Sequence, residues 1–414
     1  MMAWRMPWQG LRREAAALIA ARGLRSVAQG ALAVDFSLYA QALGWSARFL
    51  GFTLGVGMLL GAGLTALVGP LSDRIGRRRF LLAYDAAVLA ASLLALATPA
   101  RTPLALAALV GGFGRGANGA AGPFAPVEQA WLAGLAPVER LGRVLSFNMA
   151  VGFTGMMSGA LLAALPGLAS KGPAPAAAYR PLFFLSALAA ALVFAVVYRL
   201  PEPAWGLRRG ERAPLAARER ELIVRLGLVN TLNGLGIGLV APLLPLWFAL
   251  RFGRGPGTIA PVVAAGLLLA ALSSLLGGRL SGRVGTVRTV VTMRAIGLGF
   301  LLAMPWAPNF GVAAALYAGR SASNRGTAGA RQALALGLVD GRRRGLAASV
   351  NSLSIQLPRA LGPILAGLMI SHGELNLPLL LAALCQGGYL LLYPLLFASH
   401  DREGRGRAAQ TPPT

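Results

Sequence analysis

The sequence predicts an all-α membrane protein whose twelve transmembrane helices form two pseudo-symmetric six-helix bundles. Three observations lead to this fold class. Charged residues make up only 13% of the chain and hydrophobic residues 56%, whereas about 25% of the residues of a soluble domain are charged. The apolar residues come in runs of about 20, the length that crosses the hydrocarbon layer of a bilayer. Arginines cluster between these runs, as they do in cytoplasmic loops.

Twelve apolar runs follow one another along the chain, and turn residues such as Thr98-Pro99 and Gly255-Pro256 mark the joints between them. The first run follows a basic leader that contains Arg5, Arg12, Arg13, Arg22 and Arg25. Because the run is long enough to span, it predicts a transmembrane helix rather than a cleaved signal peptide. The expected helices cover residues 24–43, 47–69, 80–98, 103–135, 144–166, 180–199, 223–250, 258–278, 289–306, 309–335, 346–371 and 376–398.

The charged, proline-containing stretch 200–222 has six expected helices on either side and therefore predicts a cytoplasmic linker. We expect an N-terminal bundle with its cytoplasmic leader over 1–199, a C-terminal bundle over 223–398 and a cytoplasmic tail over 399–414. An internal repeat supports the division, since two tripeptides of the first half have partners in the second at one constant offset. These are Glu128-Gln129-Ala130 with Arg331-Gln332-Ala333, and Ser146-Phe147-Asn148 with Ser349-Val350-Asn351.

The distribution of basic residues predicts the orientation of the chain. With both ends inside, about 27 of the 39 lysines and arginines fall in inner segments and about 6 in outer loops. We therefore expect a multi-pass protein of the plasma (inner) membrane with both termini in the cytoplasm. The same distribution accounts for the net charge of +25 without a nucleic-acid partner, which would need the basic side chains on one exposed face.

The chain offers no pattern typical of an enzyme. It contains no nucleotide-binding loop, no metal-ligand cluster and no nucleophile–base pair, so we expect neither catalysis nor a cofactor. The single cysteine, Cys385, lies in an apolar run and predicts a packing residue rather than a reactive thiol.

The stretch between the second and third expected helices reads Gly69-Pro70-Leu71-Ser72-Asp73-Arg74-Ile75-Gly76-Arg77-Arg78. It resembles the loop motif of the major facilitator superfamily, G-x-L-x-D-R-x-G-R-R. Its glycines permit a tight turn, and Asp73 can pair with arginines or cap a helix start. The resemblance implies a gating loop that locks the inner side in one state, formed by Gly69, Asp73, Arg74, Gly76, Arg77 and Arg78.

In the fourth expected helix, Arg115-Gly116-Ala117-Asn118-Gly119 is similar to the family's R-x-x-Q-G motif, with Asn118 in place of glutamine. The resemblance extends over essentially the whole chain. It implies alternating access between two bundles and a central cavity lined mainly by helices 1, 4, 7 and 10. The antiporter motif of helix 5 is incomplete, with Met156 where proline is expected and only Gly152, Gly155 and Gly159 in place. This departure weakens the case for drug–proton antiport.

Ionisable groups inside a membrane are costly and therefore mark candidate functional residues. Asp35 in helix 1 and Arg115 in helix 4 both fall near mid-depth when residues are counted at 1.5 Å each. In an ion pair between them, the arginine would favour the ionised form of Asp35, whereas burial would favour its neutral form. A proton-coupling site requires such opposing effects, although a purely structural pair is the alternative.

Glu128 and Arg331 occupy equivalent positions of the repeat, so they predict an inner gate between helices 4 and 10. Glu128 could equally brace the arginines of the gating loop. Asp85 follows this loop closely and is also expected to brace it. Arg294 and Arg359 lie near inner ends, where their side chains can reach the water.

The expected helices 7 and 10 are unusually polar. Helix 10 contains Arg320, Asn324 and Arg325, and helix 7 contains Asn233. Hydrogen bonds between helices explain part of this polarity. Arginines with no acid in their own half favour an anionic solute, unless Arg320 and Arg325 pair with Asp35 or Glu128 across the cavity.

These features together predict a monomeric secondary transporter in the lipid bilayer that moves a small solute, with protons as the coupling ion. Export of amphipathic compounds is the first hypothesis, and uptake of an organic anion or metabolite is the second. A membrane sensor that does not transport is a third, but it would need neither the loop motif nor the intramembrane charges.

Overall fold

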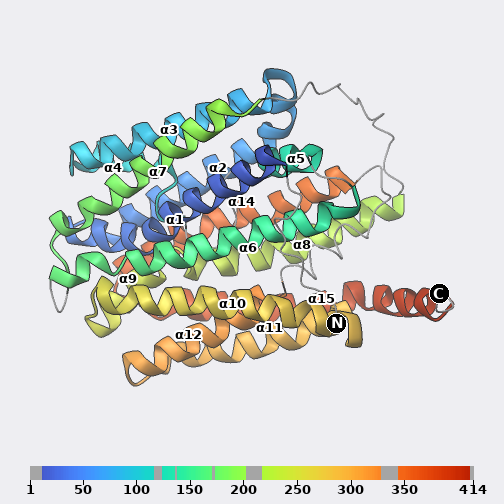
Figure 1. Cartoon of the computed structure of the whole chain (residues 1–414). Helices are drawn as coiled ribbons and strands as arrows, with labels where there is room; N and C mark the ends of the chain where they lie inside the picture. The colour runs from blue at the N-terminus through green and yellow to red at the C-terminus, as the bar shows by residue number, and fades with distance from the viewer. Residues whose placement is uncertain are drawn as a thin grey trace, which may run out of the picture. The chain divides into compact units, whose positions relative to one another are not determined.

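The computed structural model describes residues 12–115, 124–135, 138–169, 173–201, 217–327 and 344–410, which are almost entirely helical and contain no strand (Figure 1). The first part of the chain forms α1 (Arg13–Ala42), α2 (Ala47–Ile75), α3 (Arg77–Ala97), α4 (Arg101–Gly111), α5 (Ala125–Leu135), α6 (Val138–Leu162) and α7 (Arg180–Arg199). The second part forms α8 (Ala217–Val240), α9 (Leu244–Phe252), α10 (Pro256–Val284), α11 (Thr286–Ala303), α12 (Phe310–Arg325), α14 (Arg344–Ser371) and α15 (Leu377–Gln410). Short 3₁₀ turns lie at Leu165–Ala169, Ala176–Tyr179 and Met304–Trp306.

The described helices fit the expected membrane spans. Eight of them are long and apolar enough to cross a membrane, and α8 with α9, bent by 42° between them, makes a ninth if counted as one span. The other three expected spans fall on α1, on α4 with α5, and on α12. Large apolar side chains point outward along the candidate spans. Leu168, Leu384, Leu391 and Leu395 are examples, each at least 70% exposed. Such surfaces are stable in lipid, and the all-α membrane fold is confirmed.

Several helix boundaries differ from the sequence prediction. The helix α8 begins at Ala217, inside the expected linker, α10 continues to Val284, and α15 extends to Gln410, into the expected tail. The first helix begins at Arg13 rather than near residue 24, and α2 continues to Ile75, through most of the expected loop. The fourth expected helix, 103–135, is interrupted after α4, because Gly112 and Gly114 both have a φ of 70°. Only glycine adopts this conformation readily, so a regular helix cannot continue through these positions.

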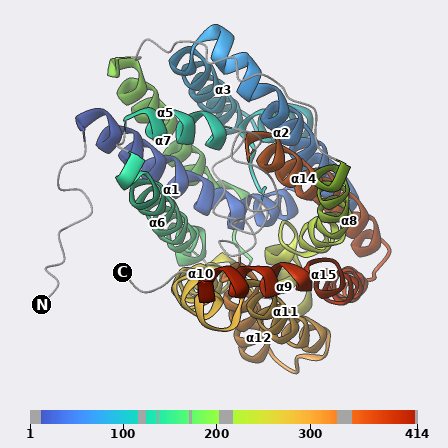
Figure 2. The same ribbon diagram turned by 90° about the vertical axis from the view of Figure 1, so that its right-hand side faces the viewer.

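The chain groups into two compact units. The first contains the described residues of 1–209 and 241–265, and the second those of 210–240 and 266–414. In the first unit α1 packs along α6, and α3 packs along α7 (Figures 1 and 2). In the second unit α8 packs along α14 and α15, and α11 along α15 and α12. Because α9 packs against α1, it is grouped with the first unit, and the domain boundaries expected at 200–222 remain a prediction.

Each unit contains one helix pair in which glycines bring the backbones into contact. On α6, Gly155 and Gly159 lie against the backbone of α1 at Gly23 and Val27. On α8, Gly238 lies against the backbone of α14 at Arg359. A Cβ at any of these glycines would collide with a carbonyl group of the facing helix. Small residues commonly allow such close approach in membranes, and the glycines of the incomplete antiporter motif serve this packing.

Replacing Gly159 by alanine should lower the free energy of unfolding by about 1–3 kcal/mol, because the added methyl group has no space against Val27. The measurement is the thermal unfolding midpoint of the purified protein in detergent. Gly63→Ala on α2 is the matched control, since no atom lies within 4 Å of a Cβ built there. Equal midpoints for the two variants would show that the α1–α6 contact is not tight.

Candidate functional site

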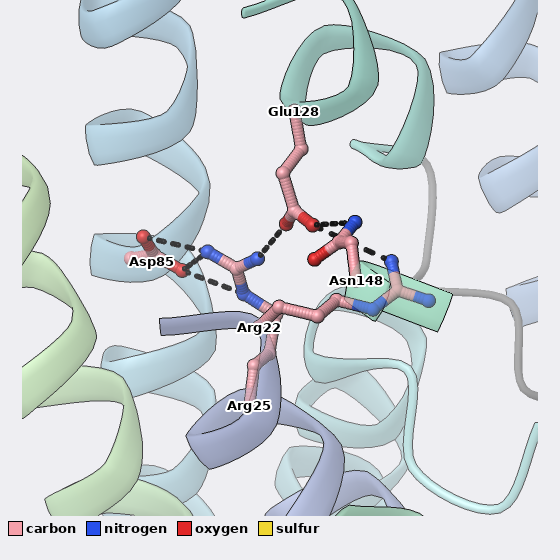
Figure 3. Close-up of polar contacts among 5 residues, drawn as sticks. All are labelled: Arg22, Arg25, Asp85, Glu128 and Asn148. Carbon is pink, nitrogen blue, oxygen red and sulfur yellow. Dashed lines mark hydrogen bonds and ion pairs between the residues drawn. The ribbon is translucent and has the colours of Figure 1, made fainter. Parts of the chain in front are cut away.

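A cluster of charged side chains lies buried in the first unit, with Arg25 at its centre (Figure 3). One Nη of Arg25 lies 2.9 Å from Oε2 of Glu128, and the other lies 3.0 Å from Oδ1 of Asp85. Arg22 lies 3.6 Å from Glu128, and the amide of Asn148 donates to the same carboxylate at 3.2 Å. Four helices, α1, α3, α5 and α6, thus meet at these five side chains.

The cluster is nearly inaccessible to solvent, and its formal charges cancel. Arg25 is 7% exposed, and Arg22, Asp85, Glu128 and Asn148 are 1–2% exposed. Arg22 and Arg25 are one turn apart on α1 and face the same side of the helix. Two arginines are balanced by two carboxylates, so neither acid is buried without a counter-charge. Such an arrangement avoids the large penalty of a lone buried ion.

This cluster corrects two sequence predictions. Arg22 and Arg25 were placed in a cytoplasmic leader, but α1 begins earlier and carries both into the unit. Asp85 does not brace the loop, because it lies well inside α3 and pairs with Arg25. Glu128 is engaged by Arg25 and Arg22. Arg331 lies outside the described residues, so the expected inner gate between Glu128 and Arg331 stays a prediction.

A small cavity of about 30 Å³ lies beside the cluster, enough to hold water. Arg25, Gln29, Tyr84, Asp85 and Ser186 contribute polar groups to its wall. The cavity is bounded by α1, α3, α7 and the end of α4. Arg25 and Asp85 line this cavity and Glu128 does not, so water there would contact the Arg25–Asp85 pair.

Asp35 is the most isolated of the buried acids that the structure describes in the first unit. Its side chain is on α1, 1% exposed, and neither carboxylate oxygen has a hydrogen-bond partner among the described residues. Aromatic rings surround this stretch of α1: Phe36 lies 5.9 Å from Phe113, and Tyr39 lies 5.1 Å from Phe183. The hydroxyl of Tyr179 is near enough to interact with the Asp35 charge.

The ion pair expected between Asp35 and Arg115 is not formed. Arg115 follows the break at Gly112 and Gly114, and its guanidinium donates back to the carbonyl of Leu109 at 3.2 Å. It lies against Gly61 of α2, because a Cβ there would be 3.3 Å from the guanidinium. Depth counting assumed a continuous helix, which the two glycines do not allow. Asn118 lies outside the described residues.

The gating-loop motif forms a sharp corner rather than a loop. Gly69, Asp73 and Arg74 belong to the last turns of α2, and the structure describes only their backbone. Gly76, with a φ of 102°, separates α2 from α3. Arg77 donates to the carbonyl of Ala130 on α5 at 2.9 Å, and Arg78 donates to the carbonyl of Tyr198 on α7. The repeat extends to this feature, since Gly285 makes the same corner between α10 and α11 with a φ of 99°.

The second unit contains a buried polar network around Arg294. This guanidinium donates to Asn233 at 2.7 Å and lies 5.0 Å from the ring of Tyr389. Gln386 donates to the carbonyl of Arg294 at 2.9 Å and to Asn324 at 3.1 Å. Arg294 is only 2% exposed, so it does not reach water as expected from the sequence. Asn233 and Asn324 were identified, but nothing in their own helices indicated Arg294 or Gln386 as partners.

The remaining candidates, Arg320 and Arg325, are on α12. Arg320 is 8% exposed, and its Nε has no hydrogen-bond partner. One terminal nitrogen of Arg325 is also buried without a partner. No acidic side chain among the described residues of the second unit pairs with either arginine. The unit therefore contains Arg294, which is held by a hydrogen bond to Asn233 and by the ring of Tyr389, and two arginines of α12 with buried donors that lack an acceptor.

Comparisons with known proteins agree with this architecture. Residues 18–225 and 226–413 each match the sequence model of the Major Facilitator Superfamily, so the two matches divide the chain into halves. No curated protein matches the sequence.

Solved transporters share the fold. A bacterial homologue of the human lysosomal transporter Spinster, inward-facing and occupied, has a TM-score of 0.77 at 14% identity, over 96% of this chain and 98% of that one. A D-xylose–proton symporter has a TM-score of 0.72 at 15% identity, with 92% and 96% covered. The nucleoside transporter NupG gives 0.72 at 12% identity, with 93% and 99% covered.

Removing the Arg25 charge should destabilise the protein strongly. We expect Arg25→Gln to lower the free energy of unfolding by about 3–5 kcal/mol, because two buried carboxylates lose their shared counter-charge. Adding Asp85→Asn to the same chain should restore part of the loss, because Arg22 and Glu128 then remain as a balanced pair. Thermal unfolding in detergent measures both effects.

The matched control is Arg225→Gln, whose pair with Glu221 is exposed (side chains 42% and 58%) and should contribute at most about 1 kcal/mol. A double variant, Arg25→Gln with Asp85→Asn, that is less stable than Arg25→Gln alone would contradict the proposed electrostatic origin.

Proposed function

This chain belongs to the major facilitator superfamily and is a multi-pass secondary transporter of a small solute, and we propose that it couples transport to protons through Asp35. The observation that carries the proposal is the isolation of this carboxyl group. It is almost fully buried on α1 and lacks a hydrogen-bond partner among the described residues. The other buried acids among the described residues of the first unit, Asp85 and Glu128, are both neutralised by arginine.

An unpaired carboxylate in apolar surroundings costs several kcal/mol as an anion. A proton or a cationic group removes this cost, whereas exposure to water makes the anion stable again. Alternating exposure of Asp35 would therefore bind a proton in one state and release it in the other. That linkage of protonation to conformation is what proton coupling requires.

For the solute and its direction, we propose export of amphipathic compounds. The aromatic side chains beside Asp35 support this choice. Rings such as Phe36, Phe113 and Phe183 are buried against one another here, and they would offer broad apolar surfaces to a flat or flexible molecule when the site opens. Uptake of an organic anion is the second candidate, favoured by the unsatisfied arginines of α12. Counterflow in right-side-out and inverted vesicles, with dyes and carboxylates as solutes, separates the two directions.

We also propose that the protein acts as a monomer in the inner membrane with both termini in the cytoplasm. The placement of basic residues supports this orientation. The motif corner at Gly76 would then lie at the cytoplasmic side. Arg77 and Arg78 join that corner to α5 and α7, which suits a device that holds the inner side closed.

If the motif is such a lock, Asp73→Asn should insert normally but shift the population toward the inward-open state and reduce transport at least about 10-fold, the effect of 1.4 kcal/mol. Labelling of cysteines introduced on the inner side measures the shift. Arg79→Gln, an exposed charge of the same corner, is the control. Normal transport by Asp73→Asn at normal expression would remove the gating role.

Asp35→Asn should abolish accumulation driven by a proton gradient while sparing solute exchange, because exchange needs no net proton movement. Asp35→Glu keeps the ionisable group and should retain part of the accumulation. The measurement is uptake and counterflow in proteoliposomes with an imposed pH gradient. Glu374→Gln, an exposed acid between α14 and α15, is the control. An Asp35→Asn protein that still concentrates solute would reduce Asp35 to a structural residue.

A further inference from the structure

We propose that Arg320 and Arg325 of α12, with Arg359 of α14, form a site in the second unit that binds the anionic group of the solute. The site would take a carboxylate, sulfonate or phosphate carried by an apolar body. It rests on the proposed transport function only for the claim that the bound anion is the transported solute. Binding of the anion itself can be tested without transport.

The first argument is unmet hydrogen-bonding capacity at buried positions. Arg320 is 8% exposed and its Nε has no acceptor, while a terminal nitrogen of Arg325 is buried without one. The hydroxyl of Ser321, 4% exposed, also lacks a partner. Buried polar groups are normally satisfied, so a group of unsatisfied donors on two turns of one helix indicates a missing acceptor.

The second argument is unbalanced charge. Arg325 is close enough to both Arg320 and Arg359 for the like charges to repel one another. No described acid of the second unit pairs with Arg320 or Arg325. A bound anion would relieve the repulsion and supply the acceptors at the same time.

Other buried arginines of the same protein provide an internal comparison. Arg22 and Arg25 also lie close together, but Asp85 and Glu128 neutralise them. Arg294 has Asn233 as an acceptor and the ring of Tyr389 beside it. Each of these arginines has a counter-charge or an acceptor side chain, although not every one of their nitrogens is hydrogen-bonded. Arg320 and Arg325 have no acidic partner among the described residues and have buried donors without an acceptor, which points to a ligand.

The chemistry of the side chain defines the ligand class. A guanidinium group offers donors in a planar fork that matches the oxygens of a carboxylate or phosphate, and it stays charged when buried. Neutral sugars or amides cannot balance the charge. An amphipathic anion combines such a head group with the apolar body proposed for the exported compounds.

The test measures binding to the full-length protein in phosphatidylcholine nanodiscs by equilibrium dialysis. The probes are radiolabelled octanoate and octanamide, which share a chain and differ in charge, with empty nanodiscs as the background. We expect octanoate to bind at least about 10-fold more tightly than octanamide, since hydrogen bonds to charged groups contribute more than neutral ones. Equal affinities in the wild-type protein would overturn the proposal without any variant.

Variants then locate the site. Arg320→Gln should weaken octanoate binding about 10-fold to 100-fold and leave octanamide unchanged, and Arg320→Lys should have a smaller effect. If Arg320→Gln does not fold, Arg325→Gln replaces it. Arg288→Gln, an exposed arginine of α11, should bind octanoate like the wild type. An equal loss in Arg288→Gln and Arg320→Gln would refute a specific site.

An anionic lipid head group could present the same oxygens, so a second arm uses nanodiscs that contain phosphatidylglycerol. A transported anion should still bind there, with at most a modest loss from competition. Complete loss of octanoate binding in these discs would assign the arginines to a lipid and contradict the proposal. Because neither arm involves a proton gradient, failure of the Asp35 hypothesis would leave these results unaffected.

Discussion

The ion pairs of Arg25 are the constraint on which the first unit depends. One guanidinium lies between Asp85 of α3 and Glu128 of α5 and belongs to α1 itself, so three helices are fixed by one side chain. In lipid, association of helices gains little from burial of apolar surface, and polar contacts and close packing must hold them together. The balanced charges also explain how α1 can begin at Arg13 and remain helical through a basic stretch. The close packing of α6 on α1 through Gly155 and Gly159 then brings Asn148 of α6 to the charged cluster around Arg25.

The membrane fold could be predicted from the sequence because its causes are local: the length of each apolar run and the side on which arginines gather. The partners of the buried charges could not. Arg22 and Arg25 look like a cytoplasmic leader until α3 and α5 bring Asp85 and Glu128 to them. Depth counting placed Asp35 and Arg115 together, but it cannot register a change of direction at Gly112 and Gly114.

In the second unit the polar residues Asn233 and Asn324 were identified as candidates from their type, yet their hydrogen bonds with Arg294 and Gln386 join four helices that are distant in sequence. Arg320 and Arg325 differ from Arg294 because donors of theirs lack an acceptor, and this difference depends on the neighbouring helices rather than on residue type. Asp35 differs again, since its isolation is defined by what surrounds it. Residue type therefore identifies where charge enters the membrane, whereas packing decides whether that charge is neutralised or available.

The glycine contacts between α1 and α6 and between α8 and α14 have a mechanical consequence. Where two backbones touch, no layer of side chains lies between them that could repack. We therefore expect each helix pair to move as one rigid body. Deformation must then concentrate at points where the helical hydrogen bonds are already interrupted. The bend of 42° between α8 and α9 and the break after α4 are two such points. Glycines thus allow both the break after α4, at Gly112 and Gly114, and the close contacts of the rigid helix pairs, whereas the bend between α8 and α9 lies at Pro242.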